Sequence, residues 1–228
     1  MGATGGGFGL EKGVHTQVTA KEAEKDSIDI FINSRPAPEA KTTRRTIEAI
    51  LTKTTKKYVV TVEHKVDVPV GSGFGTSAGG ALTAGLALRE ALGLPLTFNQ
   101  IGKVAHVAEI QCQTGLGTVS SLTFIGGCVL VVEPGAPGIC QIDRIPIKPD
   151  YMVVASYSNS CIAKKPVLSC PQRKQEINRY GKETLEAILS EPCLENFLER
   201  CWEFAQKAGF ATENTRQLCC SDSKKGQL

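Results

Sequence analysis

The sequence has few features that would tie it to a membrane, to nucleic acid or to a secretory route. No apolar run approaches the ~18 residues that a membrane-spanning helix needs, and Met1–Gly9 is rich in glycine rather than apolar, unlike a signal peptide. The formal net charge of +3 is too small to indicate binding to nucleic acid or to an anionic membrane. We therefore expect a cytoplasmic protein whose partner is a small molecule, and the sequence leaves a homodimer open.

Cysteine is plentiful, with nine residues, but its spacing indicates neither a zinc site nor a disulfide framework. There is no Cys-x-x-Cys pair and no histidine at zinc-finger distance from a cysteine. The number of cysteines is odd, and several of them lie inside apolar periodic segments. We predict that they are reduced and act as small buried hydrophobic side chains.

The expected helices and strands favour an α+β fold, because they follow one another without a regular β-α-β alternation. Thr97–Gln100 is a capping box that marks the start of one helix. The opening Gly5–Gly9 has no strand pattern and is expected to be a flexible turn. Strands are expected over 14–19, 28–32, 58–68, 128–132, 142–147 and 151–156, and helices over 42–52, 77–92 and 97–112 and in most of the remainder up to Gly209.

A chain of 228 residues can form one or two domains. Pro146 and Pro149 mark the best candidate boundary, so we expect domains at 1–148 and 149–228. The polar end, Ser221–Leu228, is expected to be disordered.

The clearest functional signal is the glycine-rich segment Pro69–Gly80, which lies between an expected strand and an expected helix. Glycines at 71, 73 and 75 allow the backbone to adopt positive φ and to approach a ligand closely. Successive N–H groups and the positive end of the following helix would then face one concavity, for which phosphate is the natural ligand. Thr76 and Ser77 add hydroxyls that could bind a phosphate oxygen or Mg²⁺.

Two other glycine motifs are excluded. The segment has no Gly-Lys-Ser/Thr, so it is not a Walker A loop, and the acidic residue that a dinucleotide-binding fold needs ~20 positions further on is missing from Leu94–Phe98. The alternative that stays open is a glycine-rich helix start used only for tight packing.

A second group of residues supports the phosphate interpretation. His106 and Glu109 come late in the next expected helix, directly before the glycine turn Gln113–Thr118. A carboxylate at a helix end beside a glycine turn can hold a Mg²⁺ ion that bridges nucleotide phosphates. Taken singly, Glu109 is more simply a solvated helical acid and His106 a partly buried histidine.

These motifs together resemble the GHMP kinases, and most closely the archaeal pantoate kinases of that superfamily. The resemblance rests on Gly-Phe-Gly-Thr-Ser-Ala-Gly-Gly, Ala-His-Val-Ala-Glu and Thr-Gly-Leu-Gly, and it extends over Gly5–Gly138. It implies a GHMP-kinase-like fold, with an N-terminal ATP-binding domain like domain 2 of ribosomal protein S5 and an incomplete α+β C-terminal domain. It also implies ATP-dependent phosphorylation of the 4-hydroxyl of pantoate to 4-phosphopantoate in coenzyme A biosynthesis.

The resemblance implies roles by position. Ser77 and Glu109 would bind Mg²⁺ and would form the catalytic set with Thr118, while His106 would bind the carboxylate of pantoate. ATP would be bound by Pro69, Gly71, Ser72, Gly73, Phe74, Gly75, Thr76, Ser77 and Ala78.

Three departures from the family pattern leave alternatives open. Thr118 stands where many family members have an aspartate and cannot act as a base, although phosphoryl transfer depends mainly on positioning and charge neutralisation. The strand near Val131 lacks an arginine that some pantoate kinases carry. The family's Pro-Gly-His strand and its late glycine-rich loop are not found, so we expect a chain truncated at both ends. The alternatives are another GHMP kinase, of the homoserine or mevalonate type, and a non-catalytic nucleotide-binding fragment.

Overall fold

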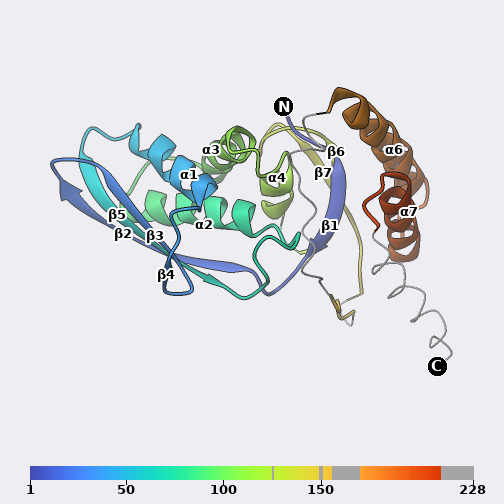
Figure 1. Cartoon of the computed structure of the whole chain (residues 1–228), viewed down its shortest axis with the longest axis horizontal. Helices are drawn as coiled ribbons and strands as arrows, with labels where there is room; N and C mark the ends of the chain where they lie inside the picture. The colour runs from blue at the N-terminus through green and yellow to red at the C-terminus, as the bar shows by residue number, and fades with distance from the viewer. Residues whose placement is uncertain (125, 149–150, 156–169, 212–228) are drawn as a thin grey trace. The chain divides into compact units, whose positions relative to one another are not determined.

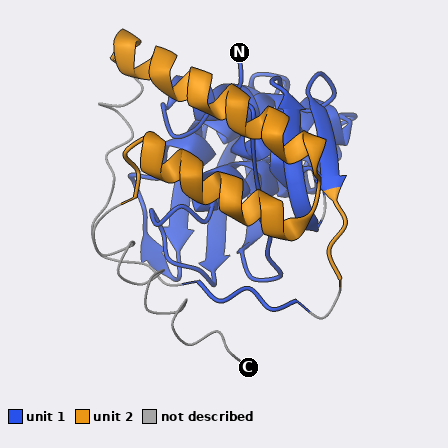
Figure 2. Cartoon of the chain, turned by 90° about the vertical axis from the view of Figure 1, so that its right-hand side faces the viewer, with its two compact units in different colours: residues 1–144, 149–161 blue, residues 145–148, 162–228 orange. Residues whose placement is uncertain are grey.

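The computed structural model describes residues 1–124, 126–148, 151–155 and 170–211. The chain divides into two compact units, coloured separately in Figure 2. The first consists of Met1–Arg144 with Pro149–Cys161, and the second of Ile145–Lys148 with Ile162–Leu228. The division into domains at residue 148 remains a prediction.

The larger sheet of the first unit has the strand order β2-β5-β3-β4. Its central strand β5 runs antiparallel to β2 and parallel to β3. Every second residue from Val60 to His64 on β5 is buried, so this strand turns one face towards the core. The strands are β2 (Val14–Ala23), β3 (Ser27–Ile32), β4 (Arg35–Pro36) and β5 (Lys57–Val66).

Two helices, α1 (Lys41–Leu51) and α2 (Thr76–Ala91), pack on one face of this sheet, and a third, α3 (Phe98–Gln111), packs against both of them on the same side (Figure 1). The predicted capping box is confirmed at the start of α3, where Gln100 N–H donates to Thr97 Oγ1 at 3.2 Å and Thr97 N–H donates to Gln100 Oε1 at 2.7 Å. The buried core between sheet and helices includes Ile30, Ile47, Ile50, Val60, Val62, Leu88 and Ile101.

The second sheet shows that the expectation of a flexible turn at Gly5–Gly9 is wrong. These residues form strand β1, which pairs antiparallel with β6 (Gly127–Glu133), and β6 also neighbours β7 (Gln141–Ile145). Strand pairing uses backbone groups, which glycine supplies without any alternation of side chains. A period-two pattern could therefore not reveal this strand, whose partner lies more than a hundred residues further along the chain.

Two further elements differ from expectation. The end of the glycine turn forms a short helix, α4 (Thr118–Leu122), and residues 151–155 are not in a strand, while Ser156 lies outside the described residues. In the second unit, α6 (Pro171–Ser190) packs against α7 (Leu194–Lys207), and Gly209 follows with a φ of 64°. Ser221–Leu228 also lies outside the described residues.

The six cysteines within the described residues are all free thiols. Cys128 is fully buried, as predicted, but Cys170 is exposed, so the prediction of burial is wrong for that residue. No helix in the described ranges is long and apolar enough to cross a membrane.

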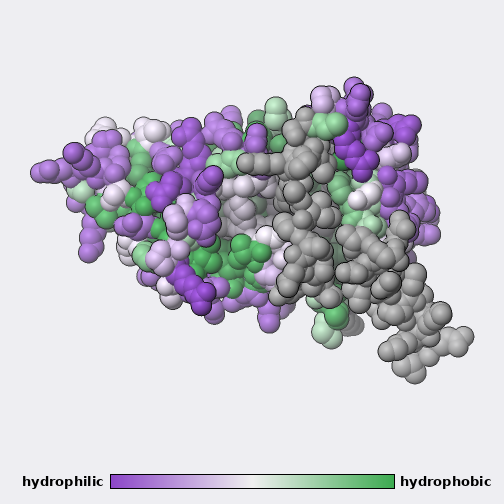
Figure 3. All heavy atoms as spheres, viewed as in Figure 1, coloured by the Kyte–Doolittle hydropathy of each residue, from purple (hydrophilic) through white to green (hydrophobic). Residues whose placement is uncertain are grey.

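Hydrophilic side chains dominate the end of the larger sheet where β2 meets the start of β5 (Figure 3). Ion pairs at this end join Lys56 to Glu22 at 2.6 Å and Lys57 to Asp26 at 2.9 Å. Asp26 also accepts a hydrogen bond from the backbone N–H of Tyr58, and the hydrogen bond from Lys57 is the main reason that its pKa is lowered.

Candidate active site

The loop between β5 and α2 has the backbone geometry of a phosphate-binding segment. Gly71, Gly73 and Gly75 have φ angles of 81°, 89° and 70°. A Cβ added at Gly71 or Gly73 would meet no atom within 4 Å, so neither glycine is needed for tight packing. Packing glycines do occur in α2, where a Cβ at Gly85 would lie 2.9 Å from Ile101 Cγ2. Tight packing therefore explains the interior of the helix but not the loop before it.

The start of α2 offers free backbone donors. Gly75, in the left-handed conformation, is the N-cap residue and provides no side-chain cap, and the first turn of the helix contains no acidic residue. The N–H groups of Thr76, Ser77 and Ala78 thus have no intrahelical acceptor, and the helix dipole adds partial positive charge at the same place. A phosphate is the ligand that this end of the helix suits best.

Ser77 is exposed, and its hydroxyl is connected to the region of Glu109 through two threonines. Ser77 Oγ donates to Thr42 Oγ1 at 2.9 Å, and Thr42 Oγ1 lies 2.9 Å from Thr114 Oγ1. Thr114 Oγ1 in turn donates to the backbone oxygen of Glu109 at 3.3 Å. Two segments that the sequence singled out separately are therefore linked by α1, which it did not single out.

Glu109 itself is buried, with 1% of its surface exposed. Its Oε2 accepts a hydrogen bond from Val119 N–H at 3.4 Å, at the start of α4. A Cβ at Gly115 would overlap Glu109 Oε1, so the turn can close over the carboxylate only with glycine at that position. Glu109 is thus a buried carboxylate held by the following turn and is not a solvated helical acid.

The potential metal ligands around Ser77 and Glu109 are oxygen atoms. The described residues contain no group of three or more His, Cys, Asp or Glu side chains that could hold a metal ion. A hydroxyl and a single carboxylate fit the preference of Mg²⁺, which usually keeps several waters and is bound through one or two carboxylates and the phosphates of the substrate. The donor set fits a metal that arrives with a nucleotide better than a resident metal centre.

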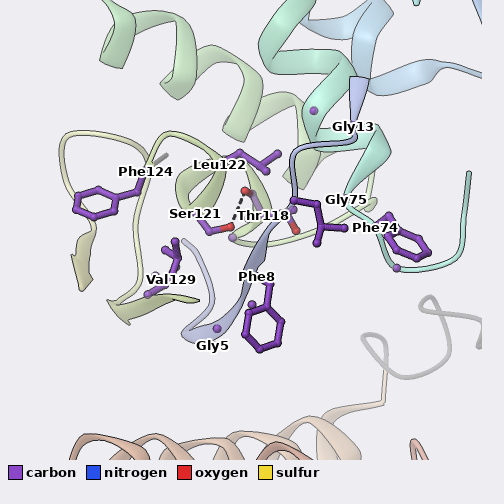
Figure 4. Close-up of a pocket in the computed structure, with 18 of the residues that line it drawn as sticks. Gly5, Phe8, Gly13, Phe74, Gly75, Thr118, Ser121, Leu122, Phe124 and Val129 are labelled. Carbon is purple, nitrogen blue, oxygen red and sulfur yellow. Dashed lines mark hydrogen bonds between the residues drawn. The ribbon is translucent and has the colours of Figure 1, made fainter. Parts of the chain in front are cut away.

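Beside the loop lies a cavity of about 600 Å³ within the first unit. It is bounded by β1, by the end of the loop at Gly73–Gly75 and by α4 (Figure 4). The Ser121 hydroxyl donates to the backbone oxygen of Thr118 at 2.9 Å on the α4 side. Phe8, Phe74 and Phe124 also line the cavity, and Arg144 lies over the Phe124 ring at 4.8 Å from its centre.

The cavity brings together only some of the residues that the sequence indicated. Gly73, Phe74, Gly75 and Thr118 line it, and a Cβ at Gly75 would lie 3.0 Å from Thr118 Cγ2. The remaining candidates do not line it: Pro69, Gly71, Ser72, Thr76, Ser77, Ala78, His106 and Glu109.

His106 is buried on α3, with 2% of its surface exposed. Its Nε2 lies 2.9 Å from the backbone oxygen of Met1, which can only accept, so Nε2 carries the proton. Nδ1 has no hydrogen-bond partner among the described residues. The imidazole of His106 faces the N-terminal segment and lies outside the cavity lining.

Lys12, which no sequence motif indicated, is the one charged side chain among the described residues that line the cavity. It lies between β1 and β2, is exposed, and forms no ion pair with another described residue. Its neighbours Gly5–Leu10 also line the cavity. The sequence around Lys12 contains no motif that indicates a binding residue, because Lys12 lies at the cavity only as a result of where β1 lies in the fold.

Comparison with known proteins identifies a family profile that covers the helices α1 to α4 of the first unit and the glycine-rich loop. The sequence profile of the GHMP kinases N terminal domain matches residues 41–124, which include α1, the glycine-rich loop 69–75, Glu109 and Thr118. The α+β architecture and this loop therefore occur within a GHMP kinase N-terminal domain.

Relatives extend over nearly the whole chain. It is 29% identical to a pantoate kinase of Methanocaldococcus jannaschii, over 96% of this chain and 76% of that protein. It is 32% identical to a pantoate kinase of Thermococcus kodakarensis, over 91% of this chain and 68% of that protein. A solved structure described as a phosphotransferase related to the CoA biosynthesis pathway superposes with a TM-score of 0.79 at 28% identity, over 98% of this chain and 72% of that one. The chain belongs to the GHMP kinases, ATP-dependent enzymes, within the family of the pantoate kinases.

Proposed function

We propose that this protein transfers the γ-phosphoryl group of ATP to the 4-hydroxyl of pantoate, forming 4-phosphopantoate and ADP, a step towards coenzyme A. The observation that carries the proposal is the cavity in which the glycine-rich loop 69–75, which we propose as the phosphate loop, meets Thr118 and Lys12, a cation with no ion pair among the described residues. The likeness to pantoate kinases over 96% of the chain supports the choice of acceptor.

The nucleotide phosphates would lie on the loop and the start of α2. Positive φ angles at Gly71, Gly73 and Gly75 would direct backbone N–H groups towards them. Pro69, Ser72, Phe74, Thr76 and Ala78 complete the segment proposed to hold ATP. Because the γ-phosphoryl group passes through a loose transition state, alignment and charge neutralisation would account for most of the rate.

Ser77 and Glu109 are the proposed ligands of Mg²⁺. When bound, the ion would neutralise charge on the phosphate oxygens. Ser77 supplies an exposed hydroxyl at the first turn of α2, and Glu109 supplies a buried carboxylate beneath the Gly115 turn. The buried position favours a fixed carboxylate, because Gly115 and Val119 N–H constrain where its oxygens lie.

The acceptor would lie in the cavity between β1 and α4. Lys12 is the group we propose for its carboxylate, because its ammonium forms no ion pair within the described part of the chain and can pair with it. The alternative group for this role is His106, whose Nε2 is already bonded to Met1. Thr118 would orient the 4-hydroxyl through a hydrogen bond and would not remove its proton, because a threonine hydroxyl is not a base at neutral pH.

Initial rates of ADP release with Mg-ATP and pantoate, homoserine or mevalonate test the choice of acceptor. We expect turnover with pantoate and kcat/KM values lower on the order of a hundredfold for the other two. All three acceptors carry a carboxylate, but homoserine has an ammonium in place of the 2-hydroxyl of pantoate and lacks its two methyl groups. Mevalonate has its primary hydroxyl one carbon further from the carboxylate, so a carboxylate held at a fixed place would misplace that hydroxyl. Turnover with homoserine or mevalonate and not with pantoate would overturn the assignment. Binding of Mg-ATP without turnover of any acceptor would favour a non-catalytic nucleotide-binding protein.

A further inference from the structure

A buried threonine on α1 connects the two segments that carry the proposed Mg²⁺ ligands. Thr42 has 3% of its surface exposed and belongs to neither the phosphate loop nor the α3 turn. Its Oγ1 lies 2.9 Å from Ser77 Oγ on one side and 2.9 Å from Thr114 Oγ1 on the other. The chain of hydroxyls ends at the backbone oxygen of Glu109, 3.3 Å from Thr114 Oγ1.

The last member of this chain fixes the direction of every hydrogen bond in it. A backbone carbonyl oxygen only accepts, so Thr114 must donate its single hydroxyl proton to Glu109. In its contact with Thr42, Thr114 Oγ1 can then only accept, so the Thr42 hydroxyl donates its single proton to Thr114. Thr42 Oγ1 must therefore accept from Ser77, as the geometry of that contact also indicates.

This direction determines what Ser77 can offer to a ligand. Its proton points inward, to Thr42, while its exposed side keeps the oxygen lone pairs. A hydroxyl held in this way presents an oxygen ligand to a cation, whereas a freely rotating hydroxyl could also turn its proton outward. Mg²⁺ requires oxygen lone pairs in a near-octahedral arrangement, so orientation matters more for it than for a hydrogen-bonded anion.

We propose that Thr42 is a positioning residue that orients the Ser77 hydroxyl as an oxygen ligand for the metal of a bound metal–nucleotide complex. Thr42 acts through Ser77 and does not touch the metal itself. The proposal rests on the proposed function only in that it requires a metal–nucleotide site at the loop, and it does not depend on which acceptor is phosphorylated.

The test compares three variants in the full chain. Thr42→Val keeps the shape of the side chain but can neither accept nor donate, and Thr42→Ser keeps the hydroxyl. Thr46→Val is the matched control, since Thr46 is fully buried on the same helix and its hydroxyl donates to the backbone oxygen of Thr42, outside the hydroxyl chain. Titration calorimetry measures Kd for Mn²⁺-ADP and, separately, for ADP in the presence of EDTA.

We expect Thr42→Val to weaken Mn²⁺-ADP binding on the order of tenfold, the size of one lost hydrogen bond to a charged site, and to leave binding of metal-free ADP within about twofold. Thr42→Ser and Thr46→Val should bind both forms as the wild type does. Equal weakening of both nucleotide forms by Thr42→Val, or an equal effect of Thr46→Val, would show a merely structural role and overturn the proposal.

Turnover of pantoate by the wild type distinguishes a failure here from a failure of the proposed function. If pantoate is phosphorylated and Thr42→Val binds Mn²⁺-ADP normally, only the positioning role is wrong. If Thr42→Val shows the selective loss while pantoate is not a substrate, the positioning role stands and the acceptor assignment is wrong.

Discussion

His64 gives this fold a built-in dependence of stability on pH. The residue lies on β5 beneath α1 and α2, with Thr16 Oγ1 at 2.8 Å from its Nδ1 and Thr43 Oγ1 at 3.2 Å from its Nε2. Thr16 also contacts the Thr83 hydroxyl at 2.6 Å, and Gly80 packs against the ring. None of these neighbours carries a charge, so nothing compensates the desolvation of a protonated imidazole.

Burial lowers the pKa of His64 from 6.5 to about 4. In the unfolded chain the imidazole takes up a proton near pH 6.5, whereas in the folded protein it does so only near pH 4. Between these values the unfolded state binds more protons, so the free energy of unfolding falls as the pH falls. At about 1.4 kcal/mol for each pKa unit, the stability present above pH 6.5 and lost by pH 4 is about 3 kcal/mol.

Urea unfolding followed by far-ultraviolet circular dichroism, at intervals between pH 7.5 and pH 4, measures this loss. His64→Gln serves as the reference, because glutamine can bond both threonine hydroxyls and does not titrate. Carboxylates elsewhere affect both proteins alike, so the difference between their unfolding free energies isolates His64. We expect this difference to change by about 3 kcal/mol in favour of the variant as the pH falls. Two curves that stay parallel would refute the reasoning.

Three further predictions concern the site. Ser77→Ala and Glu109→Gln should each lower kcat at least about a hundredfold while the urea midpoint changes little; unchanged rates in both variants would mean that the site is misplaced. Gly115→Ala should lower kcat in the same way as Glu109→Gln, because its Cβ would displace the Glu109 carboxylate. Gly93→Ala is the control for the general cost of alanine at a turn glycine, since its Cβ would meet no atom within 4 Å, and it should leave kcat unchanged. Lys12→Met should raise KM for pantoate on the order of tenfold without changing KM for ATP. With the neutral amide of pantoate as acceptor, wild type and Lys12→Met should have the same KM. Lys21→Met on β2 is the control and should change neither the KM for pantoate nor the KM for ATP. If His106→Gln raises KM for pantoate in this way and Lys12→Met does not, the carboxylate is bound by His106.

Most of the fold could be predicted from local sequence patterns. The capping box at Thr97, the strand expected over 58–68 and the helices expected over 42–52 and 97–112 each follow from patterns within a few residues, and the structure confirms them as the start of α3, β5, α1 and α3. Strand β1 could not be predicted in this way, because its glycines provide no side-chain pattern and its partner, β6, is remote in the sequence.

In the candidate site, too, only the residues that belong to local sequence motifs could be predicted. The glycine-rich loop 69–75 and Glu109 could be proposed as site residues from the sequence, because glycine spacing and a helix-end carboxylate are local signals. Thr42 and Lys12 could not be predicted as site residues from the sequence. Thr42 comes close to Ser77 only because α1 packs against α2, and Lys12 lies at the cavity only because β1 lies beside the loop. The hydroxyl chain from Ser77 to Glu109 exists only once three helices are assembled.

The most direct test of the central claim is to identify the product formed from Mg-ATP and pantoate by phosphorus and proton magnetic resonance. We predict one phosphomonoester signal that correlates with the protons on C4 of pantoate and that grows at the same rate as ADP. A phosphoryl group at another position, or ADP formed without any phosphorylated pantoate, would contradict it.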